Sequence, residues 1–120
     1  MKKIFALLFL LSFTLILYSQ TTSCDELLQF ITENSYKKAT LNNYTLNSSW
    51  LTQVTAYTYE YKTYVVAEIK QKNAYTTNTY IFCGIPNQNW TNFQYGSYGD
   101  SGSYGERFHK YIIDYKCNCN

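Results

Sequence analysis

The N-terminal segment of this 120-residue chain constrains its fold more than any other stretch. Lys2 and Lys3 are followed by the almost wholly apolar run IFALLFLLSFTLILY and then by the small residue Ser19. A basic end, a short apolar core and a small residue are typical of a secretory signal peptide. The apolar run is shorter than the roughly 20 residues that a membrane-spanning helix needs. We therefore predict that residues 1–19 are a signal peptide, that it is cleaved, and that the mature form has no transmembrane segment.

Loss of this leader would make the mature chain neutral. The full sequence has ten Lys plus Arg and eight Asp plus Glu, and two of its lysines lie in the leader. Proteins that bind phosphate backbones need clustered positive charge, because counterion release supplies much of their affinity. After the leader, Lys37 and Lys38 are the only adjacent basic pair. The sequence therefore disfavours nucleic acid as a partner, and it leaves the oligomeric state open.

The cysteines indicate where the chain folds. Their even number, in a small exported chain, predicts disulfide bonds. A bond between the last two, across a single Asn, would have poor geometry, so each of the first two should pair with one of the last two, in either order. No CxxC pair or histidine ladder is present, and we expect neither a metal nor another cofactor. The four residues are Cys24, Cys83, Cys117 and Cys119.

Cys24 permits a second interpretation, in which it carries a lipid anchor. Ser23 is small enough for lipoprotein processing, but Thr21 stands where an aliphatic residue is usual. Lipidation would also leave an odd thiol among the three other cysteines. We therefore expect a secreted or periplasmic protein, with lipid attachment through Cys24 as the alternative.

The mature sequence predicts one α+β domain whose sheet is a three-stranded antiparallel β-meander. The expected strands alternate in polarity and are rich in Tyr and Thr, which favour pleated, half-buried surfaces. The gaps after them, at Lys62–Thr63 and Lys72–Asn73, are short enough for hairpins. The strands are expected at Trp50–Tyr61, Tyr64–Gln71 and Ala74–Cys83.

Helices are expected on either side of this meander. Before it, Ser23 and Glu26 have the spacing of a capping box and open an N-terminal helix. After it, Trp90 and Phe93 are three residues apart, as on one turn of a short helix. Ser103 then opens the clearest helix, so one or two C-terminal helices should pack on one face of the sheet. The apolar stripe of that helix consists of Tyr104, Phe108, Tyr111, Ile112 and Tyr115.

A glycine-rich segment, residues 95–105, precedes the last helix. It has a glycine at every third position but lacks the Lys-Ser/Thr ending of a phosphate-binding P-loop. We expect a mobile loop here and no phosphate site.

Three segments occur in an order that is similar to a known family. Ser48-Ser49 precedes an apolar strand, YIFCGIP spans residues 80–86, and SYGERFHKYI spans residues 103–112. Together they resemble the KTSC domain, a short module named from its occurrence at the C-terminus of some lysyl-tRNA synthetases. The matched positions of the last two segments are Tyr80, Phe82, Pro86, Ser103, Gly105, Phe108, His109 and Ile112.

The resemblance implies a KTSC-like domain over residues 48–120, with residues 20–47 as an N-terminal helical extension. The family has no settled activity, although RNA binding has been suggested for it. The chain departs from the family pattern at Phe82, which replaces a Tyr, at Arg107, which replaces an aromatic residue, and at His109, which replaces an Asn.

Residues that could carry catalysis are few. His109 is the only histidine, and Glu106 lies three residues before it. A nucleophile–base pair needs a Ser or Cys within hydrogen-bond reach, and no motif supplies one. Asp100 and Asp114 are scattered acids without an acid–base motif. We therefore expect no catalytic residue in this chain.

These observations predict a non-enzymatic binding module for an unknown protein or glycan. It would present its tyrosine-rich strand faces and its glycine-rich loop, through Tyr57, Tyr59 and Tyr98. The alternative is an RNA-binding domain that stacks bases on aromatic rings, which rests on the family resemblance alone. A small hydrolase using His109 is a distant third.

Overall fold

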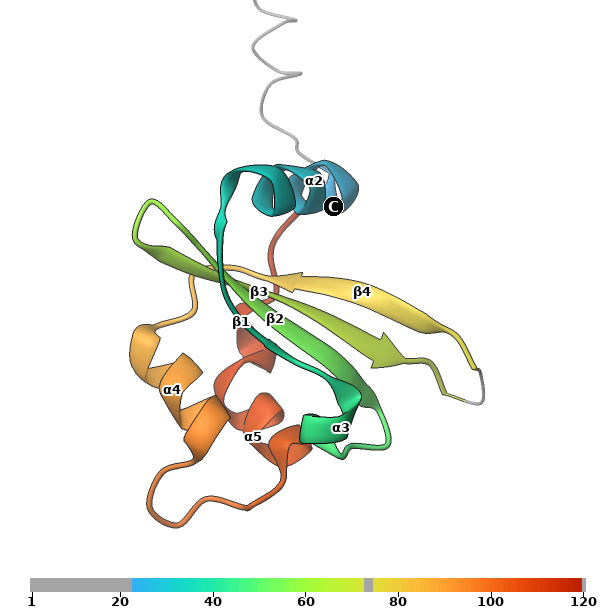
Figure 1. Cartoon of the computed structure of the whole chain (residues 1–120), viewed down its shortest axis with the longest axis vertical. Coiled ribbons are helices and arrows are strands. Elements are labelled where there is room, and N and C mark those ends of the chain that lie inside the picture. Colours follow the sequence, from blue (N-terminus) through green and yellow to red (C-terminus); the bar gives the residue numbers. More distant parts are fainter. Residues whose placement is uncertain (1–22, 73–74, 120) are drawn as a thin grey trace, which may run out of the picture.

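The computed structural model describes residues 23–72 and 75–119, and the predicted signal peptide lies outside them. The described chain is α+β, as expected, with a four-stranded sheet between helices on its two faces (Figure 1). In chain order the elements are α2 (Cys24–Asn34), β1 (Tyr36–Leu41), α3 (Asn43–Leu46), β2 (Leu51–Tyr59), β3 (Lys62–Lys70), β4 (Thr77–Phe82), α4 (Asn87–Tyr95), α5 (Tyr104–Tyr111) and the 3-10 turn η1 (Ile113–Tyr115).

The sheet has one strand more than the sequence indicated. The antiparallel meander β2–β3–β4 is confirmed, and β1 pairs antiparallel with β2 to give the order β1-β2-β3-β4. Within β1 only Leu41 is buried, so the strand lacks the apolar alternation that identifies a strand in a sequence. The stretch 20–47, expected to be a helical extension, therefore contains both α2 and a strand.

The first hairpin turn also differs from the prediction. It lies at Glu60–Tyr61, two residues before the expected gap, because β3 begins at Lys62. Both turn residues have positive φ angles, 49° for Glu60 and 65° for Tyr61. Two-residue hairpin turns of this kind favour Asn and Gly, so a Glu-Tyr turn gives no sequence signal.

The main hydrophobic core lies between the sheet and the pair α4 and α5. Alternating residues of β2 and β3 enter it as predicted, among them Val54 and Val65. At its centre the ring of Phe108 makes edge-to-face contacts with Phe82 and Phe93, at centroid distances of 5.3 and 5.7 Å. Each such pair contributes about 0.5–1.5 kcal/mol beyond the area it buries.

A second, smaller cluster covers part of the opposite face, beneath α2. Ile31 is the one fully buried residue of α2, and it packs near Tyr57 and Ile81 of the sheet. Ser23 caps this helix as predicted, since its hydroxyl accepts a hydrogen bond from the Glu26 N–H at 3.1 Å. The C-terminal tail completes the cluster.

Two disulfides join this cluster to the chain ends, Cys24–Cys119 and Cys83–Cys117. The structure thus selects one of the two predicted pairings. The bonds close sequence separations of 95 and 34 residues, for which loop entropy gives about 3–5 kcal/mol each. They indicate an oxidising, extracellular or periplasmic environment. In this structure the Cys24 sulfur is bonded to Cys119, so a lipid on Cys24 would require this disulfide to be absent.

Candidate functional site

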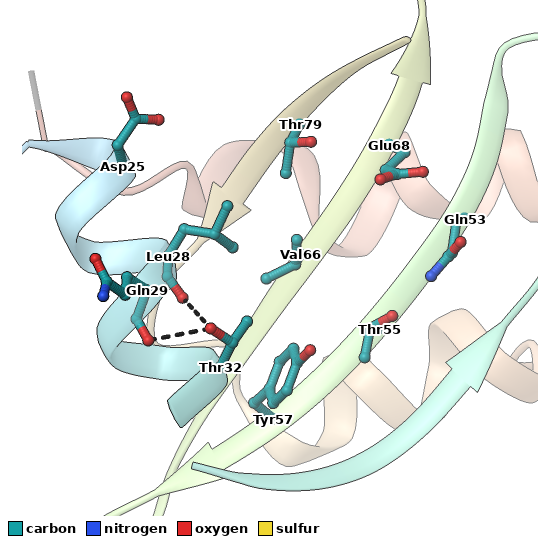
Figure 2. Close-up of a pocket in the computed structure, with 10 residues that line it drawn as sticks. All are labelled: Asp25, Leu28, Gln29, Thr32, Gln53, Thr55, Tyr57, Val66, Glu68 and Thr79. Atoms are coloured by element: carbon teal, nitrogen blue, oxygen red, sulfur yellow. Dashed lines mark hydrogen bonds between the residues drawn. The ribbon is translucent and has the colours of Figure 1, made fainter. Parts of the chain in front are cut away.

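A groove lies beside α2, over the part of the sheet that this helix leaves uncovered (Figure 2). Its volume is about 440 Å³. Figure 2 shows side chains entering it from α2 and from β2, β3 and β4. The lining residues are Asp25, Leu28, Gln29, Thr32, Gln53, Thr55, Tyr57, Val66, Glu68 and Thr79.

Strand register explains why this groove is polar. Gln53 is paired with Glu68 and Glu68 with Thr79, so the three side chains form one row across β2, β3 and β4. The next row, in which Thr55 faces Val66, lies closer to α2. Because side chains alternate along a strand, both rows lie on the face of the sheet that α2 covers. α2 packs over the inner row only and does not reach the outer row. The outer row therefore remains open to solvent.

The chemistry of the groove is that of a hydrogen-bonding surface with a small apolar floor. Its lining includes two carboxylates, Asp25 and Glu68, and no Lys, Arg or His. The amides of Gln29 and Gln53 add donors and acceptors. The Thr32 hydroxyl is already engaged, because it donates to the carbonyls of its own helix (Figure 2). This set can bind hydroxyl or amine groups, and its negative charge opposes phosphate.

The tyrosines expected to form a binding face do not come together. Tyr57 is only 9% exposed and belongs to the core beneath α2, so it lines the groove but does not project its ring into solvent. Tyr59 packs edge-to-face on Phe30, with centroids 5.1 Å apart. Tyr98 is fully exposed, in the loop at the far end of α4. Sequence alternation identified the face of Tyr57 but not the helix that covers it.

The positions matched to the KTSC pattern are mainly structural. Phe82, Phe108 and Ile112 lie in the main core, and Tyr80 packs at its margin. Pro86 and Ser103 are the residues at the N-caps of α4 and α5. Gly105 lies under Trp50, where a Cβ would be 2.9 Å from the indole nitrogen, so only glycine fits without a shift. The spacing of the motif thus follows from packing and capping.

His109 lies on the exposed side of α5 against Trp50, with ring centroids 5.0 Å apart. Among the described residues, no hydrogen bond joins its ring to a hydroxyl or a carboxylate. The cysteines cannot act as nucleophiles, because all four are in disulfides.

The glycine-rich segment is a loop, as predicted, but Arg107 attaches it to the helices. This buried guanidinium donates to the carbonyls of Phe93 at 2.8 Å, Gln94 at 3.3 Å and Ser101 at 3.0 Å. The positive charge therefore satisfies the C-terminal carbonyls of α4, which carry the negative end of the helix dipole. The face of the Tyr104 ring lies 4.4 Å from the guanidinium carbon. An Arg at this position thus orders the segment.

Asp100 closes the same loop against α5, a role that the sequence did not reveal. Its buried carboxylate accepts hydrogen bonds from the Lys110 ammonium, the Tyr111 hydroxyl and the Ser97 N–H. These bonds, with that from Lys110 the largest, lower the pKa of Asp100 to about 2. In return, the hydrogen bond to Asp100 raises the pKa of both Lys110 and Tyr111. The contacts order the loop and create no open reactive group.

No protein-family model, no curated protein and no solved structure matches this chain. Within residues 23–72 and 75–119, no helix is long and apolar enough to cross a membrane. The same residues bring together no group of three or more His, Cys, Asp or Glu that could bind a metal ion.

Proposed function

We propose that this protein is a non-enzymatic exported binding module for a protein or glycan, and that the groove between α2 and the sheet is its ligand surface. The supporting observation is the open polar row Gln53, Glu68 and Thr79 beside an apolar floor. Within this choice, the groove favours a neutral or basic glycan. Its amides and carboxylates can bind sugar hydroxyl groups, and its aliphatic floor suits their C–H faces.

The proposal is tested with the mature, oxidised protein labelled for NMR. Soluble neutral, basic and acidic oligosaccharides are titrated into it at millimolar concentration. We expect neutral or basic sugars to shift the backbone amides of Gln53, Thr55 and Glu68. Acidic sugars should bind more weakly, since Asp25 and Glu68 repel them. If no sugar moves these amides, a glycan is the wrong ligand for the groove.

A double variant, Gln53→Ala with Glu68→Gln, removes donors and acceptors from the open row without touching the buried floor. Loss of two hydrogen bonds should weaken binding by about tenfold or more. Glu60→Gln is the matched control, because it removes an exposed carboxylate at the hairpin turn, outside the groove. Equal binding by the double variant and the control would remove the groove as the ligand surface.

RNA binding is the second candidate, and one surface favours it. Tyr36 and Tyr61 are largely exposed at the hairpin end of the sheet, near Lys37, Lys38 and Lys62. Exposed rings between cations suit base stacking on single strands. Titration of the protein with single-stranded RNA at two salt concentrations tests this candidate, and binding that salt and Tyr61→Ala leave unchanged would dismiss it.

Membership of the KTSC family is a proposal that rests on the ordered motifs. Its matched positions lie in the core and at the helix caps. Family membership would therefore imply a shared fold but would not identify a ligand. A hydrolase using His109 is the third candidate, and a hydrolytic activity that His109→Ala leaves intact would rule out that residue.

A further inference from the structure

The outer edge of β4 is paired over only part of its length. β3 covers the inner edge of this strand. On the outer edge, the Cys83 N–H donates to the Tyr115 carbonyl at 2.8 Å, and the Cys117 N–H donates to the Ile81 carbonyl at 3.0 Å. The C-terminal tail thus begins a fifth strand along β4 and then leaves toward the disulfide with α2.

The remaining stretch of this edge, Thr77–Tyr80, has no neighbouring strand among the described residues. In an antiparallel strand, alternate residues direct both backbone groups to the same side. The Gln71 N–H donates to the Thr76 carbonyl across the β3–β4 hairpin. The even-numbered residues of β4 therefore direct their backbone N–H and C=O groups toward β3. Thr77 and Thr79 therefore direct their N–H and C=O groups outward, in line with the row that the tail begins.

The two edges of the sheet differ in how they are protected. β1 has Lys37 and Lys38 and an irregular register between Lys37 and Ala39, which are common devices against unwanted strand pairing. β4 has an unbroken register over Thr77–Phe82 and no charge or proline in it. The β4 edge is therefore the one at which an added strand would meet no built-in obstacle.

A small pocket of about 260 Å³ opens on the main-core side of this edge. Its floor is apolar, with Ile69, Tyr80 and Ile113, and its charged residues are Lys70 and Lys116. The Lys116 ammonium lies 5.1 Å from the centre of the Tyr80 ring. In an antiparallel pair, a residue opposite Tyr80 would have its Cβ about 4.5–5.5 Å from that of Tyr80. Its side chain would therefore reach the mouth of this pocket.

We propose that the open edge of β4 binds an extended peptide of a partner protein by strand addition. Backbone hydrogen bonds to Thr77 and Thr79 would fix the peptide, as in other strand-addition complexes. A carboxylate side chain opposite Tyr80 would enter the mouth of the pocket and approach the Lys116 ammonium, and an aliphatic side chain two positions along, opposite Asn78, would lie on the same face. This site goes beyond the proposed groove and shares only Thr79 with it.

A second copy of the chain fits this edge less well than a peptide. A two-fold pairing of two β4 strands about Asn78 would set Thr77 of one copy opposite Thr79 of the other, and Tyr75 opposite Ile81. Cys117 already occupies the position opposite Ile81, since its N–H donates to the Ile81 carbonyl. A free peptide can end before this point, and the cationic pocket selects one with acidic and aliphatic side chains.

The test uses the mature, oxidised protein and the peptide Glu-Thr-Val-Thr-amide, which sets Glu opposite Tyr80 and Val on the same face. We expect NMR titration to shift the Thr77 and Thr79 amides most and to slow their exchange with solvent. The control peptide has Lys in place of Glu and should bind more weakly. Failure of the Glu peptide to bind at millimolar concentration would overturn the proposal.

Two protein variants make the test specific. Thr79→Pro removes an N–H that points to the open edge and leaves the β3 ladder intact, so the fold should persist while peptide affinity falls about tenfold or more. Thr79→Val keeps the N–H and should bind like the parent protein. Lys116→Glu should reverse the preference between the Glu and Lys peptides.

Equal peptide binding by Thr79→Pro and the parent protein would exclude strand addition. Dimerisation that Thr79→Pro abolishes, without peptide binding, would assign the edge to a second copy and overturn the proposal. The groove variant Gln53→Ala with Glu68→Gln should leave peptide binding unchanged. A negative result for the β4 edge therefore leaves the proposal for the groove standing, and the reverse also holds.

Discussion

The two faces of the sheet are covered in different ways. α4 and α5 cover one face through a cluster of buried aromatic rings centred on Phe108, and no disulfide joins these helices to the sheet. α2 covers the other face with one fully buried residue, Ile31, and its first residue, Cys24, is bonded to the C-terminal tail. A covalent bond thus accompanies the face that buries little apolar area. The incomplete cover also leaves the groove open.

Phe108→Ala should have the largest effect, because it removes the ring at the centre of the well-packed face. We expect the free energy of unfolding to fall by about 3–5 kcal/mol. Denaturant unfolding of the oxidised protein measures it. Phe30→Ala is the control, since Phe30 is 43% exposed on α2 and should cost less than about 1 kcal/mol. Equal losses would contradict the contrast between the faces.

Removal of the Cys24–Cys119 bond, by changing both cysteines to Ser, tests the covalent side of the comparison. The unfolded chain regains the freedom of a long loop, and we expect a loss of about 2–4 kcal/mol. Hydrogen exchange should show the larger gain in opening at Tyr57 and Ile81, whereas the main core around Phe108 should open faster only by the fall in global stability. Uniform opening of both cores would show that the two faces unfold as one unit.

Arg107→Met tests whether the loop between α4 and α5 needs its buried cation. Three carbonyls would lose their donor, and we expect the free energy of unfolding to fall by about 1–3 kcal/mol. Arg107→Lys retains the charge but not the planar fork, and should recover only part of this loss. Full stability of Arg107→Met would mean that water satisfies the carbonyls equally well.

The smallest effect is expected for Asp100, and it depends on pH. The native pKa is about 2, below the ordinary 3.8, so the unfolded chain takes up this proton first as the pH falls. The contribution of Asp100 to stability is therefore complete above about pH 4 and is lost between about pH 4 and 2. Asp100→Asn should flatten this part of the stability profile. An NMR titration of the Asp100 carboxyl measures the pKa directly.

The sequence predicted local features well, because these depend on neighbouring residues. The antiparallel meander and the helix caps at Ser23 and Ser103 are confirmed. It missed β1, whose polar residues pair at an edge and need no apolar face. It also placed the first hairpin turn two residues late. Glu60 and Tyr61 adopt left-handed backbone angles there, and neither residue type predicts such angles.

For the candidate sites, the sequence supplied residues but not their neighbours. It treated Tyr57 as a presented ring, whereas α2 covers it. Gln53, Glu68 and Thr79 have no motif in common, and only the register of three strands brings them into one row. The open edge of β4 depends on where the tail leaves the sheet, which a long-range disulfide decides.

By itself the sequence determined the α+β class, the strand faces, the helix starts and the set of cysteines that could pair. These features follow from periodicity and spacing, which depend on residues that are close together in the sequence. The tertiary structure alone decided the disulfide order, the fourth strand, the groove and the open edge. Each of these depends on which distant segments meet, and that is settled by packing the whole chain around two cores.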